Sequence, residues 1–281
     1  MIITNNFVFV HLHKSGGTFV GKTILKLFPE ARQIGYHYPI TMIPPEYQNL
    51  PVLGVVRNPW DFYVSYYAFQ KSLVAKFEAE KGNLSQTEYQ SLVDRGIDPR
   101  NGIDILFDVL SNEGKLDFFQ TTTNFLNLGS PAGKLDEVLE LMPAELGRRG
   151  KFTPIQKQGF RGMNIIRDDL EKIRDTGKGF YTFLFEHIYG IENNVYFARM
   201  ETLRQDLINI LQQFGIEINQ LKQEFIKSAA RENVSNHKNY LSYYTAELEN
   251  LVKEKDALVI DKFDYKLSHE NLSYSLENSP V

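Results

Sequence analysis

A short polar segment near the N-terminus carries the residue types that bind anions. Residues 13–18 read His-Lys-Ser-Gly-Gly-Thr and directly follow an apolar run. Glycines let the backbone curl so that successive N–H groups point inward, a helix N-terminus adds a partial positive charge, and a lysine adds a full one. A glycine-rich turn that only connects two elements is the alternative, but the flanking Lys, Ser and Thr favour an anion site.

A second candidate anion site follows the apolar run at residues 51–56. Arg57 ends this run, where a charged side chain is unfavourable unless it points out of the sheet toward a partner. Asn58 is a typical N-cap for a following helix, and Ser65 lies within about two helical turns, roughly 10 Å, of the strand end. Arg57 and Ser65 can therefore converge on one phosphate group. An ion pair for Arg57 and an ordinary helical serine are the alternatives for each residue alone.

The first segment also matches the Walker A pattern of kinases and ATPases. Gly16–Thr23 fits G-x-x-x-x-G-K-[ST], in which Lys22 would hold the β- and γ-phosphates. A helix that begins at Gly17 instead places apolar residues 20, 24, 27 and 28 on one face and leaves Lys22 in solvent. The run at 257–261 resembles a Walker B strand only nominally, because its context is charged and helical. We predict that the match is coincidental, and a P-loop NTPase or kinase is kept as an alternative.

Strand and helix signals alternate around these two sites. Residues 6–12 and 51–56 have strand composition, and helices are predicted after them, over Gly17–Phe28 and from Pro59 to about Lys71. A third strand is expected at residues 194–200, with a helix after it. This alternation indicates a three-layer α/β fold with a central parallel sheet. Such sheets bind nucleotides at the carboxyl ends of their strands, where both candidate anion sites fall.

The rest of the chain is expected to be mostly helical. Residues 72–193 are predicted to be helices and loops laid over the sheet, with helices near Ile103–Leu110 and Asp136–Met142. A last helix is expected from Tyr240 to about Lys253. Because there are no internal repeats and no low-complexity linker, we predict a single domain over residues 1–281.

Composition limits the class of protein. The 281 residues are 42% hydrophobic and 23% charged, which is typical of a globular protein. No apolar run approaches the roughly 20 residues that cross a bilayer, and the N-terminus lacks the features of a secretory signal. The absence of Cys excludes disulfides and thiolate chemistry, and the formal net charge of −4 argues against a generic nucleic-acid binder. We expect a cytoplasmic protein with no membrane insertion and no nucleic-acid partner.

Two segments together resemble the sulfotransferases that use 3′-phosphoadenosine 5′-phosphosulfate (PAPS). Residues 11–18 look like the family's 5′-phosphosulfate loop, in the form found in heparan-type carbohydrate sulfotransferases. His13 stands where those proteins usually have Pro. Residues 55–65 are similar to the family's 3′-phosphate motif, including the spacing from Arg57 to Ser65.

Later segments extend the resemblance to both ends of the chain. Arg199–Leu203, followed by Asp206, resembles a strand–helix segment of the family, and the tail from Asn233 to Tyr265 is similar to the ending of many bacterial members. Residues 72–190 carry little of the resemblance. It implies a P-loop NTPase-like sulfotransferase fold with helical insertions covering the acceptor side.

The resemblance also implies an activity and roles for residues. A sulfuryl group would pass from PAPS to an acceptor hydroxyl and leave adenosine 3′,5′-bisphosphate, with no metal required. Lys14 would stabilise charge on the leaving phosphate and the bridging oxygen, and Arg57 and Ser65 would hold the 3′-phosphate. The 5′-phosphate would lie against five backbone amides, those of Ser15, Gly16, Gly17, Thr18 and Phe19.

The catalytic base and the acceptor are less constrained. His37 lies in the stretch Arg32–Tyr38, for which a short strand is expected, and precedes the strand that leads to Arg57. By resemblance, several carbohydrate sulfotransferases carry a catalytic His at this place, and a histidine can accept a proton near neutral pH. Most single histidines are structural, and a Glu or Asp is the base in some relatives. The resemblance favours a carbohydrate or small-molecule acceptor. Aromatic residues that could stack on a sugar face are Tyr36, Tyr38, Phe180, Tyr181 and Phe183, although such residues more often pack in a core or a lid. A nucleotide-binding module without catalysis is the remaining alternative.

Overall fold

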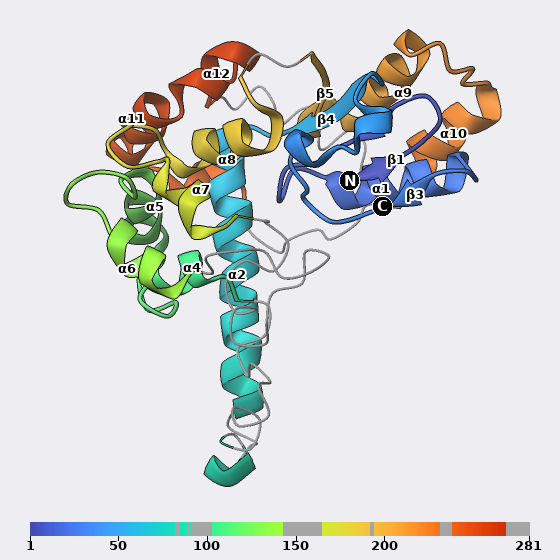
Figure 1. The fold of residues 1–281 in the computed structure, drawn as a ribbon. Coiled ribbons are helices and arrows are strands. Elements are labelled where there is room, and N and C mark those ends of the chain that lie inside the picture. The colour runs from blue at the N-terminus through green and yellow to red at the C-terminus, as the bar shows by residue number, and fades with distance from the viewer. Residues whose placement is uncertain are drawn as a thin grey trace. The chain divides into compact units, whose positions relative to one another are not determined.

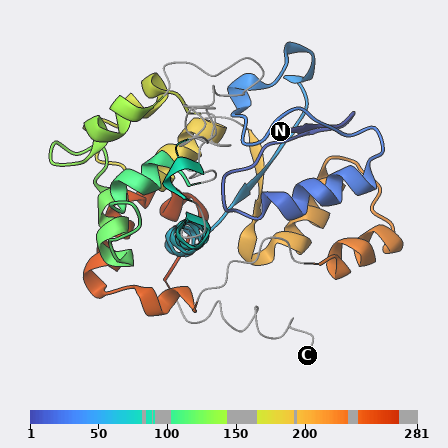
Figure 2. The ribbon, with the colours of Figure 1, turned by 90° about the horizontal axis from the view of Figure 1, so that it is seen from below.

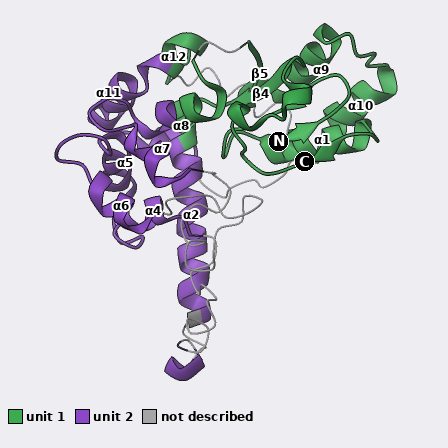
Figure 3. Cartoon of the chain, viewed as in Figure 1, with its two compact units in different colours: residues 1–62, 184–234, 259–281 green, residues 63–183, 235–258 purple. Residues whose placement is uncertain are grey.

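The structure, a computed structural model, describes residues 1–81, 85–88, 90, 103–142, 165–191, 194–230 and 238–267. The chain forms two compact units (Figure 3). The first contains residues 1–62, 184–234 and 259–281, and the second contains residues 63–183 and 235–258. Each unit is assembled from segments far apart in the sequence, and the expectation of one domain over residues 1–281 stays a prediction. In the described parts of the chain, the helices are all too short or too polar to span a membrane.

The first unit is built on a five-stranded sheet (Figure 1). Its strands are β1 (Ile2–Ile3), β2 (Val8–Phe9), β3 (Arg32–Gln33), β4 (Val52–Val56) and β5 (Val195–Arg199). They lie in the order β3-β1-β2-β4-β5, and β2, β4 and β5 run parallel to one another. The α/β class and these three parallel strands are confirmed. The sheet as a whole is mixed, because β1 is antiparallel to both β2 and β3. The expectation of a central parallel sheet therefore holds for β2, β4 and β5 and does not extend to β1 and β3.

A tight turn explains the antiparallel edge. Residues 4–7 are all that separates β1 from β2, and a parallel connection needs a crossover of a dozen or more residues. The Thr4 hydroxyl accepts hydrogen bonds from the backbone amides of Asn6 at 3.2 Å and Phe7 at 2.9 Å. It also donates to the Phe7 carbonyl at 2.8 Å. Local side-chain hydrogen bonding thus closes a hairpin at this point.

Helices cover one face of the sheet (Figure 2). They are α1 (Gly17–Leu27), α9 (Leu203–Gln213) and α10 (Gln220–Ser228). Their apolar side chains form one buried cluster with Phe9 and Leu53 of the sheet. α1 begins at Gly17, as the spacing of its apolar residues predicted.

Aromatic rings cover the opposite face. Phe197 of β5 packs on three rings from the ends of α8 (Phe180–Tyr189) and α12 (Ala257–Phe263). The ring-centroid distances are 5.5 Å to Phe185, 4.9 Å to Tyr189 and 5.1 Å to Phe263. Its neighbour Tyr196 points the other way and contacts Phe214 at 4.9 Å. Alternate residues of β5 therefore face the two helical layers, as the pleat of a strand requires.

The Tyr189 hydroxyl joins β4 to the segment that follows β2. It accepts hydrogen bonds from the backbone amides of Leu12 and Val55, both at 3.0 Å, and donates to the Val55 carbonyl at 2.7 Å. Burial raises the pKa of this phenol, so it stays protonated and can donate. The last ladder bond between the strands runs from the Val10 amide to the Leu53 carbonyl at 2.9 Å. Tyr189 therefore satisfies backbone groups just where the two strands separate.

The second unit is helical in its described residues. Its helices are α2 (Pro59–Lys81) from Tyr63 onward, α4 (Ile105–Leu110), α5 (Phe118–Leu126), α6 (Leu135–Leu141), α7 (Arg167–Glu171), the start of α8 and α11 (Ala246–Lys255). The helices predicted near residues 103–110 and 136–142 are confirmed, and α2 extends beyond its predicted end at Lys71. The helix predicted from Tyr240 begins only at Ala246, because the Thr245 hydroxyl caps it by accepting from the Leu248 amide at 3.3 Å.

A buried carboxylate ties three helices of the second unit together. Asp256, which is 0% exposed, accepts hydrogen bonds from the Tyr63 hydroxyl and from the Thr182 amide, both at 2.8 Å. The Tyr63 oxygen in turn accepts from the Tyr181 amide at 3.1 Å. Burial raises the pKa of Asp256 to about 6 despite these donors.

The Tyr189→Phe substitution should destabilise the protein markedly. It leaves the buried amides of Leu12 and Val55 without their acceptor, which costs about 2–4 kcal/mol. Urea unfolding measures the change. Tyr47→Phe is the matched control, because the Tyr47 hydroxyl contacts Arg32 at an exposed site, and it should change the free energy of unfolding by less than about 0.5 kcal/mol. Equal effects of the two substitutions would contradict the role given to Tyr189.

Asp256 should make the stability of the second unit depend on pH. The carboxyl binds a proton more readily in the folded chain than in the unfolded chain, whose Asp titrates near 3.8. The free energy of unfolding should therefore fall by roughly 3 kcal/mol as the pH rises from about 4 to about 6. Asp256→Asn should remove this component of the pH profile, whereas Asn in place of the exposed Asp168 should leave it intact. Parallel profiles for all three proteins would refute the assignment.

Candidate functional site

The segment between β2 and α1 forms a turn suited to anions. Lys14 and Gly16 have left-handed backbones, with φ of 58° and 82°, whereas Ser15 between them does not. Alternating backbone handedness makes successive amides converge on one point. Gly16 also lacks room for a side chain, because an added Cβ would lie 2.6 Å from Met200 Sδ and 2.8 Å from Leu203 Cδ2.

Hydrogen bonds within the turn decide which groups can meet a ligand. The Ser15 hydroxyl donates to the His13 carbonyl at 3.3 Å, and Ser15 is 0% exposed. The Phe19 amide donates to the Gly16 carbonyl at 3.1 Å, so it is engaged in the turn. Contact of a 5′-phosphate with the amides of residues 15–19 stays a prediction. The Phe19 ring lies below the Arg204 guanidinium, 4.7 Å from its centre.

Lys22 and residues 257–261, which the Walker interpretation requires, do not lie in this turn. Lys22 is exposed in the body of α1, five residues after the helix begins at Gly17. The nominal Walker B run, residues 257–261, belongs to helix α12 and not to a strand. Neither placement favours a P-loop NTPase.

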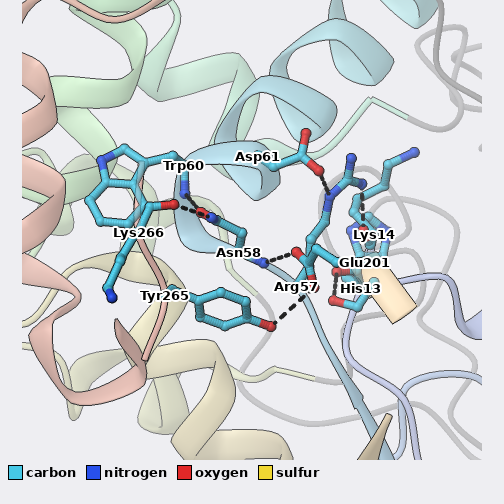
Figure 4. A network of polar contacts seen from close by, with 10 residues as sticks. His13, Lys14, Arg57, Asn58, Trp60, Asp61, Glu201, Tyr265 and Lys266 are labelled. Atoms are coloured by element: carbon cyan, nitrogen blue, oxygen red, sulfur yellow. Dashed lines mark hydrogen bonds and ion pairs between the residues drawn. The ribbon is translucent and has the colours of Figure 1, made fainter. Parts of the chain in front are cut away.

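Arg57 links the ends of β2 and β4. Its Nε donates to Asp61 Oδ2 at 2.7 Å and its Nη1 donates to the Lys14 carbonyl at 2.9 Å (Figure 4). Arg57 is only 9% exposed, so a buried guanidinium needs such partners. The ion pair that was one alternative for Arg57 is present, and the same side chain also holds the lysine turn. The structure therefore brings Lys14 and Arg57 together.

The start of α2 is fixed by a second set of polar contacts (Figure 4). Asn58 caps the helix by accepting from the Trp60 amide at 3.0 Å, which confirms the predicted N-cap. Its own amide donates to Glu201 at 2.8 Å, and its side chain donates to the Lys266 carbonyl at 3.0 Å. Sequence reasoning assigned no role to Glu201. Its position just after β5 could have identified it as a site residue. The carboxyl end of β5 lies at the same end of the parallel strands as Lys14 and Arg57.

Ser65 belongs to the second unit. It is buried in α2, and Arg57 belongs to the first unit. Their convergence on one phosphate group stays a prediction.

His37 lies in a cluster of three histidines. Its ring centroid is 4.3 Å from that of His11 and 4.9 Å from that of His13. Its Nδ1 lies 3.2 Å from the His11 carbonyl oxygen. Because that oxygen can only accept, Nδ1 carries the proton of the neutral ring and Nε2 carries the lone pair. The backbone of His37 is left-handed, with φ of 51°, an uncommon conformation for a non-glycine residue.

Burial keeps the three imidazoles neutral. It lowers the pKa of His37 to about 4 and the pKa values of His11 and His13 well below the usual range. His11 is 7% exposed, stacks on Phe9 at 5.3 Å and lies against Gly17, where an added Cβ would overlap its ring. This packing supports a structural role for His11. The described residues contain no group of three His, Asp or Glu side chains arranged to hold a metal ion.

The aromatic residues suggested for stacking on a sugar differ in exposure. Phe180, Tyr181 and Phe183 are buried in the second unit. Tyr36, directly before His37, is 62% exposed. In the tail that resembles the ending of bacterial members of the family, residues 233–237 lie outside the described residues.

Gly17 should tolerate a side chain much less well than a neighbouring glycine of the same helix. Gly17→Ala forces a methyl group into the His11 ring and should destabilise the protein by about 1–3 kcal/mol. Gly21→Ala is the control, because its Cβ would meet Ile2 at 3.3 Å and helix propensity favours Ala. Thermal unfolding compares the two. Removing the ring with His11→Ala should recover part of the loss, and a strictly additive double mutant would contradict the contact.

Lys14, Arg57 and His37 thus lie around one turn at the carboxyl ends of β2 and β4. Comparison of the chain with protein-family models, with curated proteins and with solved structures gives no match. What these residues could do therefore follows from their own chemistry. They can bind an anion and exchange a proton beside it.

Proposed function

We propose that the protein is a PAPS-dependent sulfotransferase that acts on an acceptor hydroxyl. The observation that carries the proposal is the hydrogen bond from Arg57 to the Lys14 carbonyl at 2.9 Å. It fixes the Arg57 guanidinium, at the end of β4, to the backbone of Lys14 in the turn that follows the parallel strand β2. This edge of a parallel sheet is where nucleotides bind, and the cations suit a donor with charge at both ends.

The residues of the turn would bind the donor and stabilise the leaving group. The amides of the turn and the N-terminus of α1 would hold the 5′-phosphate, while Lys14 would stabilise the charge that develops on it. Arg57 would contact the 3′-phosphate, with Ser65 as its predicted partner. The acceptor oxygen would attack sulfur as the bond from sulfur to the bridging phosphate oxygen breaks, which releases adenosine 3′,5′-bisphosphate.

His37 is the proposed base. In its neutral form the hydrogen bond to His11 leaves Nε2 as the nitrogen that can take the acceptor's proton. The exposed ring of Tyr36 beside it is suited to contact the flat face of an acceptor. A carbohydrate or a small molecule with a hydroxyl group is the acceptor that fits these features.

The protein should bind adenosine 3′,5′-bisphosphate without magnesium. Lys14→Ala should weaken binding by about tenfold to a hundredfold, because a charge-assisted contact is lost. Lys22→Ala is the matched control and should bind normally, since Lys22 is exposed on α1. Calorimetric titration measures both affinities.

The same pair of variants separates the alternatives. Stabilisation by ATP with magnesium, no binding of the bisphosphate and a strong effect of Lys22→Ala would establish the NTPase or kinase interpretation instead. Normal bisphosphate binding with no sulfuryl transfer from PAPS to any hydroxyl compound would point to a nucleotide-binding module without catalysis.

A further inference from the structure

The three histidines lie directly beside the proposed anion turn. His13 precedes Lys14 in the chain, and His37 packs on both His11 and His13.

Charge at the turn acts on these rings. Burial lowers the pKa of His13 most, and His37 and then the Lys14 ammonium lower it further. Among the described residues, the titratable groups that act on the three rings are Lys14 from the turn, the amine of Met1 just before β1 and the imidazoles themselves, and the Met1 amine is the one that lowers the pKa of His37. Each of these groups is a cation when protonated. An anion bound next to Lys14 therefore acts on the rings in the opposite direction and favours a protonated imidazole.

We propose that His37 is a proton-linked part of the anion site, so that the bound donor itself makes His37 basic. In the free protein, burial, together with the nearby amine of Met1, leaves this imidazole a poor proton acceptor. Once an anion occupies the turn, Nε2 of His37 takes up a proton from the solvent as the solution becomes weakly acidic. Near neutral pH the ring is then mostly neutral but basic enough to accept the proton of an acceptor hydroxyl. This inference rests on the proposed function.

Calorimetry of bisphosphate binding tests the inference. Titrations near pH 6 in buffers with different ionisation enthalpies give the number of protons taken up per adenosine 3′,5′-bisphosphate bound. The ligand's own phosphates titrate near this pH, so the useful quantity is the difference between the unchanged protein and His37→Asn. Asn tolerates the left-handed backbone at this position. We expect a difference of about half a proton, which corresponds to about a threefold change in relative affinity per pH unit.

Two controls accompany the titrations. His187→Asn makes the same substitution in α8 of the first unit, outside the cluster, and should retain the proton uptake of the unchanged protein. Proton NMR follows the His37 ring in the unchanged protein directly, and His37→Asn serves only to assign its resonance. That resonance should titrate about two pH units higher with the bisphosphate bound than without it, in line with uptake of about half a proton near pH 6.

The outcomes are distinct. Equal proton uptake by the unchanged protein and His37→Asn, or an unaltered midpoint in the NMR titration, would overturn the inference and leave the anion site in place. Failure of the bisphosphate to bind at all would overturn the proposed function, and the inference with it.

Discussion

The hydrogen bonds of the Arg57 guanidinium hold the carboxyl end of β4 against the segment that follows β2. The guanidinium is nearly buried, and its two hydrogen bonds go to Asp61 of the following helix and to the carbonyl of Lys14. A charge in that position is tolerated only when it is paired and hydrogen-bonded. Because Lys14 and Arg57 come from different strands, the same requirement fixes the lysine turn against the end of β4.

Close packing then shapes the turn itself. Gly16 lies against Met200 and Leu203, and Gly17 lies against the His11 ring. An added Cβ would overlap neighbouring atoms at either position, so the backbone of the turn comes close to the elements beside it. The residues after β5 thus support the segment after β2, and packing in the core determines the geometry available to an anion.

The histidine cluster shows how burial determines the protonation state of a side chain. Three imidazoles pack ring against ring, and desolvation keeps them uncharged. A neutral ring with its Nδ1 proton directed at a carbonyl has one basic nitrogen. Its strength as a base then depends on the charge of whatever occupies the neighbouring turn. Buried carboxylates such as Asp256 follow the same rule with the opposite sign, because burial makes them harder to ionise.

Local patterns in the sequence were sufficient for the beginning of α1, the N-cap of α2 and the strand β5. These depend on the spacing of apolar residues and on side-chain contacts within a few positions, which the chain carries in any environment. The sequence also predicted Lys14 and Arg57 as candidate anion-binding residues, because each follows a strand-like run. It did not reveal that β1 is antiparallel, that α2 continues to Lys81 or that Glu201 contacts Asn58. Only the tertiary structure decided those features, and it alone placed His37 against His11 and His13 and gave Arg57 the carbonyl of Lys14. Such contacts join residues 24 to 143 positions apart, and no local preference encodes which distant group will be the partner of a buried side chain.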